Sequence, residues 1–333
     1  MKEVYIKALS YYLPEKVLTN EDLVRDFPEW SAEKVVSKVG INKRHISADD
    51  ETSGDMAVSA ARNLFSEWSI NPSDIDFVIL CTQSPDYFLP TTACIIQERL
   101  NIPTSAGALD FNLGCSGYVY GLAVAKGLIA GGIAKNVLLL TAEQYTKFIH
   151  PKDKGNRTIF GDGASASLIS ETGFAKIGNF SLGTDGKGMN NLIVETGGLR
   201  NRNQMPEEIM DGNDAVKYPN NLYMNGSDIF TFTLERVPPL VNDILAKNNF
   251  EKSDIDLHIC HQANKYMLDF LRKKMAIDPD KFYYYLSEVG NTVSSTIPIA
   301  IYEARKENRL SGKVLIAGFG VGYSWGGTIL EIV

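Results

Sequence analysis

One cysteine stands where a predicted strand turns into a predicted helix. Cys115 follows the strand-like apolar run at 108–113 and precedes an apolar-periodic helix predicted over 117–130. At such a turn a thiol meets unpaired backbone N–H groups and the positive end of the helix dipole, and both favour the nucleophilic thiolate. The flanking Gly114 and Gly117 would let a substrate approach the backbone closely. The same context also fits a small buried residue at a tight turn, so catalysis and packing are both open at this point.

A histidine and an asparagine occupy comparable junctions. His261 follows LHIC at the carboxyl end of a predicted parallel strand, where open α/β sheets bind their ligands. Its neighbour Cys260 would point to the opposite sheet face, so the two make a poor metal site. Asn291 stands at a loop-to-helix junction in EVGNTVSSTIP. Each has a structural alternative, namely a core histidine bonded to backbone and an asparagine that caps a helix.

Three alternating glycines, Gly318, Gly320 and Gly322, mark the C-terminal segment GFGVGYSWGGTIL. The pattern does not fit GxGxxG and so does not predict a dinucleotide site. Glycines at a strand end predict backbone brought close to another group, such as an N–H donor aimed at an oxyanion. HExxH, GxSxG and EF-hand patterns are absent from the sequence, as are CxxC pairs among the cysteines at 81, 94, 115 and 260. We expect no metal and no bound redox cofactor.

An internal repeat indicates which elements position these residues. SDID at 73–76 recurs at 253–256, an offset of 180 residues, and the apolar run at 135–143 resembles that at 312–320, an offset of 177. Apolar residues at helical spacing predict helices before these strands, over 56–68, 117–130, 234–248 and 295–308. Alternating strands and helices with short connections predict an α/β fold with mostly parallel strands. Two unrelated α/β units with similar strands are the alternative to a duplication.

The repeat divides the chain into two halves that we expect to pack as one body. Residues 1–175 carry the cysteine, and residues 176–333 carry the histidine and the asparagine. Gly114-Cys115 matches Gly290-Asn291 at an offset of 176, so pseudo-symmetry would place Cys115 and Asn291 across the axis from one another. The polar stretch 197–221 has no clear period and predicts a long surface loop, of a kind that often covers a site.

Composition narrows the class of protein. The chain has 333 residues, of which 44% are hydrophobic and 22% charged, as in ordinary globular proteins. A net charge of −7 argues against nucleic acid as a partner, because phosphate binding needs a basic surface. Glu3 and Lys7 interrupt the first apolar stretch, unlike a signal peptide, and no apolar run reaches the roughly 20 residues needed to span a bilayer. We expect a cytoplasmic protein with free thiols.

At these residues the chain resembles β-ketoacyl-acyl carrier protein synthase III, of the thiolase superfamily. The matching segments run from end to end: YYLPEKVLTNEDL, VGINKRHIS, TTACIIQERL, GCSG, IFGDGASA, HQAN, GNTVSSTIP and GFGVGYSWGGTIL. The resemblance implies a thiolase-like α/β fold, with duplicated βαβ-rich halves in five layers, α-β-α-β-α, and a homodimer. It also implies acyl transfer from a coenzyme A thioester to a cysteine, followed by decarboxylative condensation with a malonyl group on acyl carrier protein.

Carried over residue by residue, the resemblance assigns catalysis to Cys115, His261 and Asn291, and the backbone oxyanion hole to Cys115 and Val321. His261 and Asn291 would donate hydrogen bonds to the malonyl thioester carbonyl during loss of CO₂. Leu89 would reach across the dimer to close the acyl pocket. The substrate-binding positions would be Lys38, Lys154, Asn264, Met224, Gly226 and Phe319. Those that dock the carrier protein would be Gln262, Ala263, Asn264, Lys265, Tyr266, Arg272, Lys273 and Lys274.

The chain departs from the family pattern where the family stacks on the coenzyme A adenine. Lys34 and Lys154 align with the Trp and Arg of that site, and Trp30 is displaced by several residues. Two other functions are compatible with the pattern. An acyltransferase of the same fold would pass the acyl group from Cys115 to an alcohol or amine, and an inactive partner subunit would shape another synthase's pocket. Retention of the Cys-His-Asn set argues against both.

Overall fold

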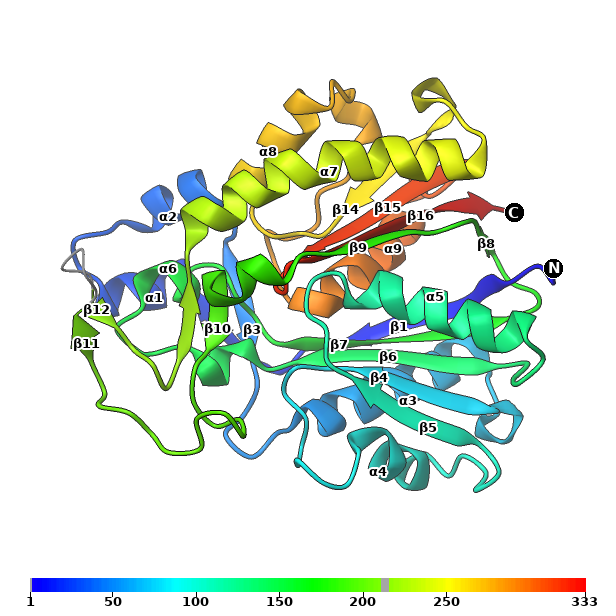
Figure 1. The fold of residues 1–333 in the computed structure, drawn as a ribbon, viewed down its shortest axis with the longest axis horizontal. Coiled ribbons are helices and arrows are strands. Elements are labelled where there is room, and N and C mark those ends of the chain that lie inside the picture. Colours follow the sequence, from blue (N-terminus) through cyan, green and yellow to red (C-terminus); the bar gives the residue numbers. More distant parts are fainter. Residues whose placement is uncertain (1, 211–215) are drawn as a thin grey trace.

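Strands and helices alternate along the chain in the computed structural model, which describes residues 2–210 and 216–333 (Figure 1). The strands are β1 (Tyr5–Tyr12), β2 (Lys16–Thr19), β3 (Lys43–Ile46), β4 (Phe77–Cys81), β5 (Gly107–Phe111), β6 (Val137–Glu143), β7 (Gly163–Ser170), β8 (Ala175–Ile177), β9 (Ser181–Thr184), β10 (Leu192–Val194), β11 (Ile209–Met210), β12 (Val216–Lys217), β13 (Leu222–Met224), β14 (Leu257–Cys260), β15 (Lys313–Gly320) and β16 (Ser324–Ile332). The α-helices are α1 (Asn20–Asp26), α2 (Ala32–Val39), α3 (Ser53–Trp68), α4 (Thr92–Arg99), α5 (Gly117–Ala130), α6 (Lys154–Arg157), α7 (Gly226–Asn248), α8 (Lys265–Lys274) and α9 (Thr296–Lys306). Short 3-10 turns lie at Pro72–Asp74, Tyr145–Phe148, Gly186–Asn191, Lys252–Asp254, Pro279–Lys281 and Val293–Ser295.

The two halves of the chain repeat one strand arrangement. The main sheet runs in the order β14-β15-β16-β8-β1-β7-β6-β4-β5, and β9 pairs with β16. In the first half, β4 pairs in parallel with β5 and β6, and β7 lies antiparallel to β6 and β1. In the second half, β14 pairs in parallel with β15 and, through His258, with a bridge at Phe282, while β16 lies antiparallel to β15 and β8. The β1–β8 pair joins the halves.

Helices cover both faces of each half-sheet, which gives five layers. The outer helices α3 and α4 pack on β1, β4, β5, β6 and β7, and α7 packs on β9, β15 and β16 on the opposite side, where α8 lies against α7. Between them lie α5, which contacts strands of both halves, and α9, which does the same (Figure 1). The segment GYVYGLAVAKGLIA is apolar nearly all round, as expected for a helix buried between two sheets. The duplicated five-layer α/β arrangement is therefore as the sequence indicated.

Most predicted elements form where the sequence places them. The helix predicted over 117–130 is α5, and that predicted over 56–68 is α3, which begins three residues earlier because Thr52 and Asp55 form a capping box. The helix predicted over 234–248 begins eight residues earlier, at Gly226, and runs on through Pro238 and Pro239. The predicted boundary between residues 175 and 176 falls inside β8.

The predicted loop over 197–221 is only partly irregular. Residues 197–208 lack regular structure, while β11 and β12 form a short antiparallel pair within the segment. Residues 211–215 of this predicted loop lie outside the described residues. Within 2–210 and 216–333, no helix combines the length and apolar character that a membrane span requires.

Candidate functional site

The turn between β5 and α5 places Cys115 at the start of the central helix. Its side chain is 7% exposed. The glycines of β15 lie directly against it: a methyl group added at Gly320 would stand 2.9 Å from Cys115 Sγ, and one added at Gly318 would stand 2.7 Å from its carbonyl oxygen. The prediction that the alternating glycines bring backbone close to another group is confirmed, and that group is the cysteine.

Burial, rather than the helix start, dominates the electrostatics of the cysteine. Removal from water, with the carboxyl group of Glu143 as a second cause, raises the pKa of the Cys115 thiol to about 12. The backbone N–H groups of Cys115 and Val321 act in the opposite direction. The backbone N–H groups at the turn thus favour the thiolate, as expected, but the desolvation penalty exceeds this stabilisation and the pKa is raised overall.

His261 emerges from the carboxyl end of β14 and is 2% exposed. Its Nδ1 atom lies 2.7 Å from the hydroxyl oxygen of Thr296, and its ring meets the ring of Phe319 edge to face at 5.9 Å. Burial lowers the pKa of His261 to about 3, so the imidazole is neutral throughout the physiological range. A neutral imidazole has one N–H donor and one acceptor nitrogen.

Asn291 follows Gly290, which adopts a left-handed backbone with φ of +72°. The Asn291 backbone joins the segment before β7, where its N–H donates to Ile159 and its carbonyl accepts from Gly161. The side-chain Oδ1 accepts a hydrogen bond from the Val293 N–H at 2.9 Å, which leaves the Nδ2 hydrogens available to another partner. Asn291 does not act as the cap of α9, for which Ser295 is the N-terminal boundary.

One enclosed cavity of about 140 Å³ brings these three side chains together. Cys115, His261 and Asn291 all line it, although they lie far apart in sequence. Four of the predicted substrate-binding residues line the same cavity: Met224, Gly226, Asn264 and Phe319. Val321 lines a separate, larger cavity, and its side chain lies beside Gly114.

The two predicted substrate-binding lysines do not line this cavity. Lys154 forms an ion pair with Glu29 and stands 5.5 Å from the ring centroid of Phe27. Lys38 stands 5.3 Å from the ring centroid of Trp30, and Lys34 shares the same ring at 5.8 Å. The displaced tryptophan is therefore clustered with lysines of α2, at a distance from the catalytic side chains.

Two of the predicted carrier-docking positions are unsuitable, which corrects that prediction. Gln262 is fully buried, where its amide donates to the Cys260 carbonyl and accepts from the Tyr285 N–H. Ala263 is buried and lines the catalytic cavity. The remaining positions do reach the surface of α8 or its start: Lys265, Tyr266, Lys273 and Lys274 are exposed, and Asn264 and Arg272 are half-buried. Lys265 forms an ion pair with Asp269 at 2.7 Å.

Leu89 lies at the tip of the loop between β4 and α4. It is 86% exposed, and its neighbours Tyr87 and Phe88 are also exposed. Three adjacent exposed apolar side chains are unusual on a monomeric surface.

The sequence did not point to three buried residues next to the site: Thr296, Glu143 and Arg44. Thr296, which contacts His261, reads in sequence only as a helix residue. Glu143 ends β6, is fully buried and accepts hydrogen bonds from the Gln83 N–H and the Ser294 hydroxyl, while burial raises its pKa to about 8. The sequence feature that could have identified Glu143 is a carboxylate at the end of an otherwise apolar strand.

A buried arginine supports the loop that carries Asn291. Arg44 is fully buried, and its guanidinium donates to Asn20 at 2.8 Å and to the Thr158 carbonyl at 2.9 Å; none of its partners among the described residues is a carboxylate. Its side chain packs against Gly161 and Gly290. Burial lowers the pKa of Arg44 to about 10. The charge is thus held by neutral acceptors beneath the two backbone segments that meet at Asn291.

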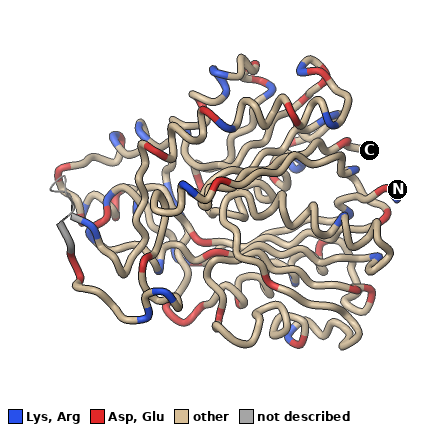
Figure 2. The backbone as a smooth tube through the Cα atoms, in the orientation of Figure 1, with Lys and Arg blue, Asp and Glu red and all other residues tan. Residues whose placement is uncertain are grey.

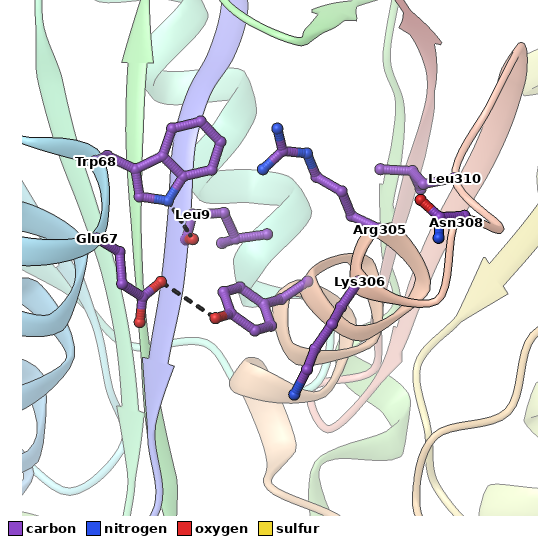
Figure 3. Close-up of a pocket in the computed structure, with 8 residues that line it drawn as sticks. Leu9, Glu67, Trp68, Arg305, Lys306, Asn308 and Leu310 are labelled. Carbon is purple, nitrogen blue, oxygen red and sulfur yellow. Dashed lines mark hydrogen bonds between the residues drawn. The ribbon is translucent and has the colours of Figure 1, made fainter.

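Another cavity, of about 540 Å³, lies apart from these residues (Figure 3). Some of its polar groups are bonded within the chain: Glu67 accepts hydrogen bonds from Ser10 and Tyr302, and the Trp68 indole donates to the Leu9 carbonyl. Arg305 lies 4.4 Å from the Trp68 ring centroid. Among the residues that the structure describes, no group of three or more His, Cys, Asp or Glu side chains is arranged to hold a metal ion.

Comparisons with known proteins agree along the whole chain. Residues 109–186 match the family model described as 3-Oxoacyl-[acyl-carrier-protein (ACP)] synthase III, and residues 245–332 match the model of its C-terminal part. A beta-ketoacyl-[acyl-carrier-protein] synthase III of Clostridium perfringens is 34% identical over 335 residues, covering 100% of both chains.

Solved structures show the same fold. A crystal structure of a 3-oxoacyl-(acyl-carrier-protein) synthase III superposes with a TM-score of 0.95 at 48% identity, covering 99% of this chain and 100% of the other. A 3-oxoacyl-(acyl-carrier protein) synthase of Burkholderia xenovorans gives a TM-score of 0.92 at 34% identity, covering 99% of this chain and 94% of the other. The chain belongs to the 3-oxoacyl-[acyl-carrier-protein] synthase III family of thiolase-fold condensing enzymes.

Proposed function

We propose that this chain condenses an acyl group held on Cys115 with a malonyl group carried on acyl carrier protein, giving a 3-oxoacyl-acyl carrier protein. The observation that carries the proposal is the convergence of Cys115, His261 and Asn291 on one enclosed cavity. Names of the relatives support the same reaction class. Transfer of the acyl group to an alcohol or amine includes no decarboxylation, so it would not require the paired hydrogen-bond donors His261 and Asn291.

In the first half-reaction the Cys115 sulfur attacks the carbonyl carbon of an acyl-coenzyme A. A new sulfur–carbon bond forms, the bond to coenzyme A breaks, and the cysteine proton leaves with the coenzyme A thiol. Negative charge develops on the carbonyl oxygen, and the backbone N–H groups of Cys115 and Val321 stabilise it. These two groups are also the ones that lower the pKa of the Cys115 thiol against the effect of burial, which fits a pair of donors aimed at the reacting atoms.

In the second half-reaction His261 and Asn291 bind the carbonyl oxygen of the malonyl thioester. Asn291 can donate from Nδ2 because its Oδ1 is held by the Val293 N–H, and His261 can donate from Nε2 when Nδ1 accepts the Thr296 hydroxyl. Loss of CO₂ leaves an enolate whose carbon attacks the acyl carbonyl on Cys115. The carbon–sulfur bond then breaks and the thiol is restored after protonation. Each donor of this kind is worth about 10²–10³ in rate.

The substrates' carriers have separate approaches. Coenzyme A would use the cluster of Trp30, Lys34 and Lys38, because lysines over an indole ring supply both charge and a stacking surface. Acyl carrier protein is acidic and would dock on the exposed basic residues of α8: Lys265, Lys273 and Lys274, with Arg272 alongside (Figure 2). This helix begins beside the cavity, because its N-terminal cap, Asn264, lines the cavity.

The chain would act as a homodimer. The exposed apolar tip formed by Tyr87, Phe88 and Leu89 then becomes buried against the second copy, with Leu89 turned toward the partner's acyl site. No bound cofactor is required, because coenzyme A enters as part of a substrate.

The reaction is tested by separating its two halves. Wild type and the Asn291→Ala variant are incubated with acetyl-coenzyme A, and acylation of Cys115 is followed by protein mass; malonyl-acyl carrier protein is then added, and the carrier product and CO₂ are measured. We expect Asn291→Ala to slow condensation by about 10²-fold while acylation changes little. Equal losses in both half-reactions would contradict this division of labour.

A further inference from the structure

One cavity contains Cys115, and a second lies beside the preceding residue, Gly114. The smaller one contains the catalytic side chains, and the larger one, of about 800 Å³, is lined by Gln83, Tyr145 and Val321 among others. Leu192 lines both. The larger cavity has a mostly apolar wall and a polar end, and that polar end is the part closest to the nucleophile.

The polar end is formed by a hydrogen-bonded pair over Gly114, the residue before Cys115. A methyl group added at Gly114 would stand 2.6 Å from Gln83 Oε1, 2.8 Å from a methyl carbon of Val321 and 3.4 Å from the Tyr145 hydroxyl. The Tyr145 hydroxyl donates to Gln83 Oε1, and Gln83 Nε2 donates to Asn112 Oδ1 at 2.9 Å. These side-chain ends therefore meet beside Gly114, one residue before the reacting cysteine.

Tyr145 separates the two cavities. It is 3% exposed, and its ring packs against Phe160 of the smaller cavity at 5.1 Å and against Phe148 of the larger cavity at 6.3 Å. Cys115 lines the smaller cavity and not the larger, whereas Tyr145 lines the larger and not the smaller. An acyl group that extends from Cys115 toward the larger cavity must pass this hydrogen-bonded pair.

The direction of the acyl group follows from the proposed function, on which this inference rests. The side of Cys115 that faces His261 and Asn291 is taken by the malonyl thioester, so the acyl chain points to the other side. An aliphatic chain there would separate Tyr145 from Gln83, so that the buried Tyr145 hydroxyl and the half-buried Gln83 amide oxygen lose their shared hydrogen bond. An acyl group with a hydroxyl or carbonyl oxygen near its thioester can replace the lost hydrogen bond.

We propose that Tyr145 and Gln83 make Cys115 select short acyl groups that carry a hydrogen-bonding oxygen one or two carbons beyond the thioester carbonyl carbon. Sites built to hydrogen-bond a substrate hydroxyl reject the analogue that lacks it, because their own polar groups are then left unpaired. The substrate class is thus a short oxygenated acyl thioester, with 3-hydroxybutyryl-coenzyme A as a suitable probe and butyryl-coenzyme A as its apolar counterpart.

The test compares these two probes in wild type and in Tyr145→Phe, with acetyl-coenzyme A alongside, by following the mass added to Cys115 over time. Wild type should be acylated faster by 3-hydroxybutyryl than by butyryl, by about 10-fold or more, and Tyr145→Phe should bring this ratio close to one. Gln83→Met, which keeps the length of the side chain without its amide, should lower the ratio in the same direction. Thr196→Val is the matched control, because Thr196 also lines the larger cavity but its hydroxyl donates to Asn220 and not to the Tyr145–Gln83 pair, and the ratio should stay at the wild-type value.

The outcomes separate this inference from the proposed function. Acylation of wild type by acetyl-coenzyme A, together with equal or faster reaction of butyryl than of 3-hydroxybutyryl, overturns the inference alone. A ratio that is the same in wild type, Tyr145→Phe and Gln83→Met also overturns it. Absence of a Cys115 adduct from all three donors overturns the proposed function, and the inference fails with it.

Discussion

The Nδ1 atom of His261 lies 2.7 Å from the hydroxyl oxygen of Thr296, and that oxygen lies 3.0 Å from the carbonyl oxygen of Val293. The Thr296 hydroxyl has one hydrogen, which it can donate either to the Val293 carbonyl or to Nδ1, and donation from Nε2 to the malonyl group requires the second arrangement. The neutral imidazole then carries its hydrogen on Nε2, where a donor to the malonyl carbonyl is needed. Thr296 is in this way a positioning residue that selects the tautomer of His261.

Removing the Thr296 hydroxyl should affect decarboxylation more than acylation. In Thr296→Val the Val293 carbonyl is left as the polar partner of Nδ1, which draws the hydrogen to Nδ1 and removes the donor at Nε2. We expect release of CO₂ from malonyl-acyl carrier protein to fall by about 10²-fold, measured against Cys115 acylation in the same preparation. Thr296→Ser, which keeps the hydroxyl, should stay close to wild type. If Thr296→Val lost both half-reactions equally, its role would be structural.

The Cys115 thiol should show no thiolate plateau in the neutral range. Burial raises its pKa to about 12, so the thiolate fraction rises about tenfold with each pH unit below that value. Alkylation by iodoacetamide, measured on the Cys115 peptide between pH 6.5 and 9.5, should therefore keep rising across the whole range. The exposed Cys94 gives an internal reference in the same digest. A plateau below pH 9 would show that the helix start outweighs burial after all.

Glu143→Gln should stabilise the protein increasingly as the pH rises. Burial raises the pKa of Glu143 to about 8, above its ordinary 4.5, so the native state holds its proton more tightly than the unfolded chain. That contribution to the free energy of unfolding is complete below about pH 4.5 and is lost progressively as the pH rises to about 8. In thermal unfolding, the stability of the variant relative to wild type should be higher at pH 8.5 than at pH 5.

The same substitution should also raise the reactivity of Cys115. Negative charge on Glu143 is one of the causes that raise the thiol pKa, and the charge is present above about pH 8. Alkylation of Cys115 at pH 9 should therefore be faster in Glu143→Gln than in wild type. A variant that is less stable at pH 8.5 and no more reactive would mean that the carboxylate, held by the Gln83 N–H and the Ser294 hydroxyl, is favoured in its charged form.

A single methyl group at Gly320 should block the nucleophile. It would stand 2.9 Å from Cys115 Sγ, closer than van der Waals contact. Gly320 is the last residue of β15, so its backbone cannot move away without disturbing that strand. We expect Gly320→Ala to lower the rate of Cys115 acylation by about 10²-fold. Gly127→Ala is the matched control: it lies in α5, meets no atom within 4 Å, and should raise the free energy of unfolding by about 0.5–1 kcal/mol. Normal acylation in Gly320→Ala would contradict the close packing.

Local pattern was sufficient for the elements that carry the catalytic residues. The predicted helix over 117–130 coincides with α5, because its apolar spacing and the glycine at its start are local signals. The offset of 180 residues makes β14 the counterpart of β4 in the second half. The internal repeat therefore predicted the duplicated sheet as well as the family resemblance did. The start of α7 was missed because Asn225 caps the helix and accepts from the Asp228 N–H before the apolar period is visible.

Other features depend on contacts between distant segments and have no local signal. Tyr145 and Gln83 meet across 62 residues of sequence, and Thr296 reaches His261 across 35. Gln262 reads as a surface residue in HQAN but is buried, because β14 and the segment after Phe282 offer its amide both a donor and acceptors. The raised pKa of Cys115 was not predicted for the same reason: the helix start is visible in sequence, whereas the depth of burial is a property of the assembled fold.

The most direct test of the account is the intact mass of the protein after incubation with acyl-coenzyme A donors, with wild type and Cys115→Ala side by side. We expect wild type to gain the mass of one acyl group and Cys115→Ala to gain none. Malonyl-acyl carrier protein should then remove the adduct from wild type as the longer 3-oxoacyl product forms on the carrier. An adduct of equal size on Cys115→Ala, or an adduct on Cys115 that malonyl-acyl carrier protein leaves in place, would contradict this expectation.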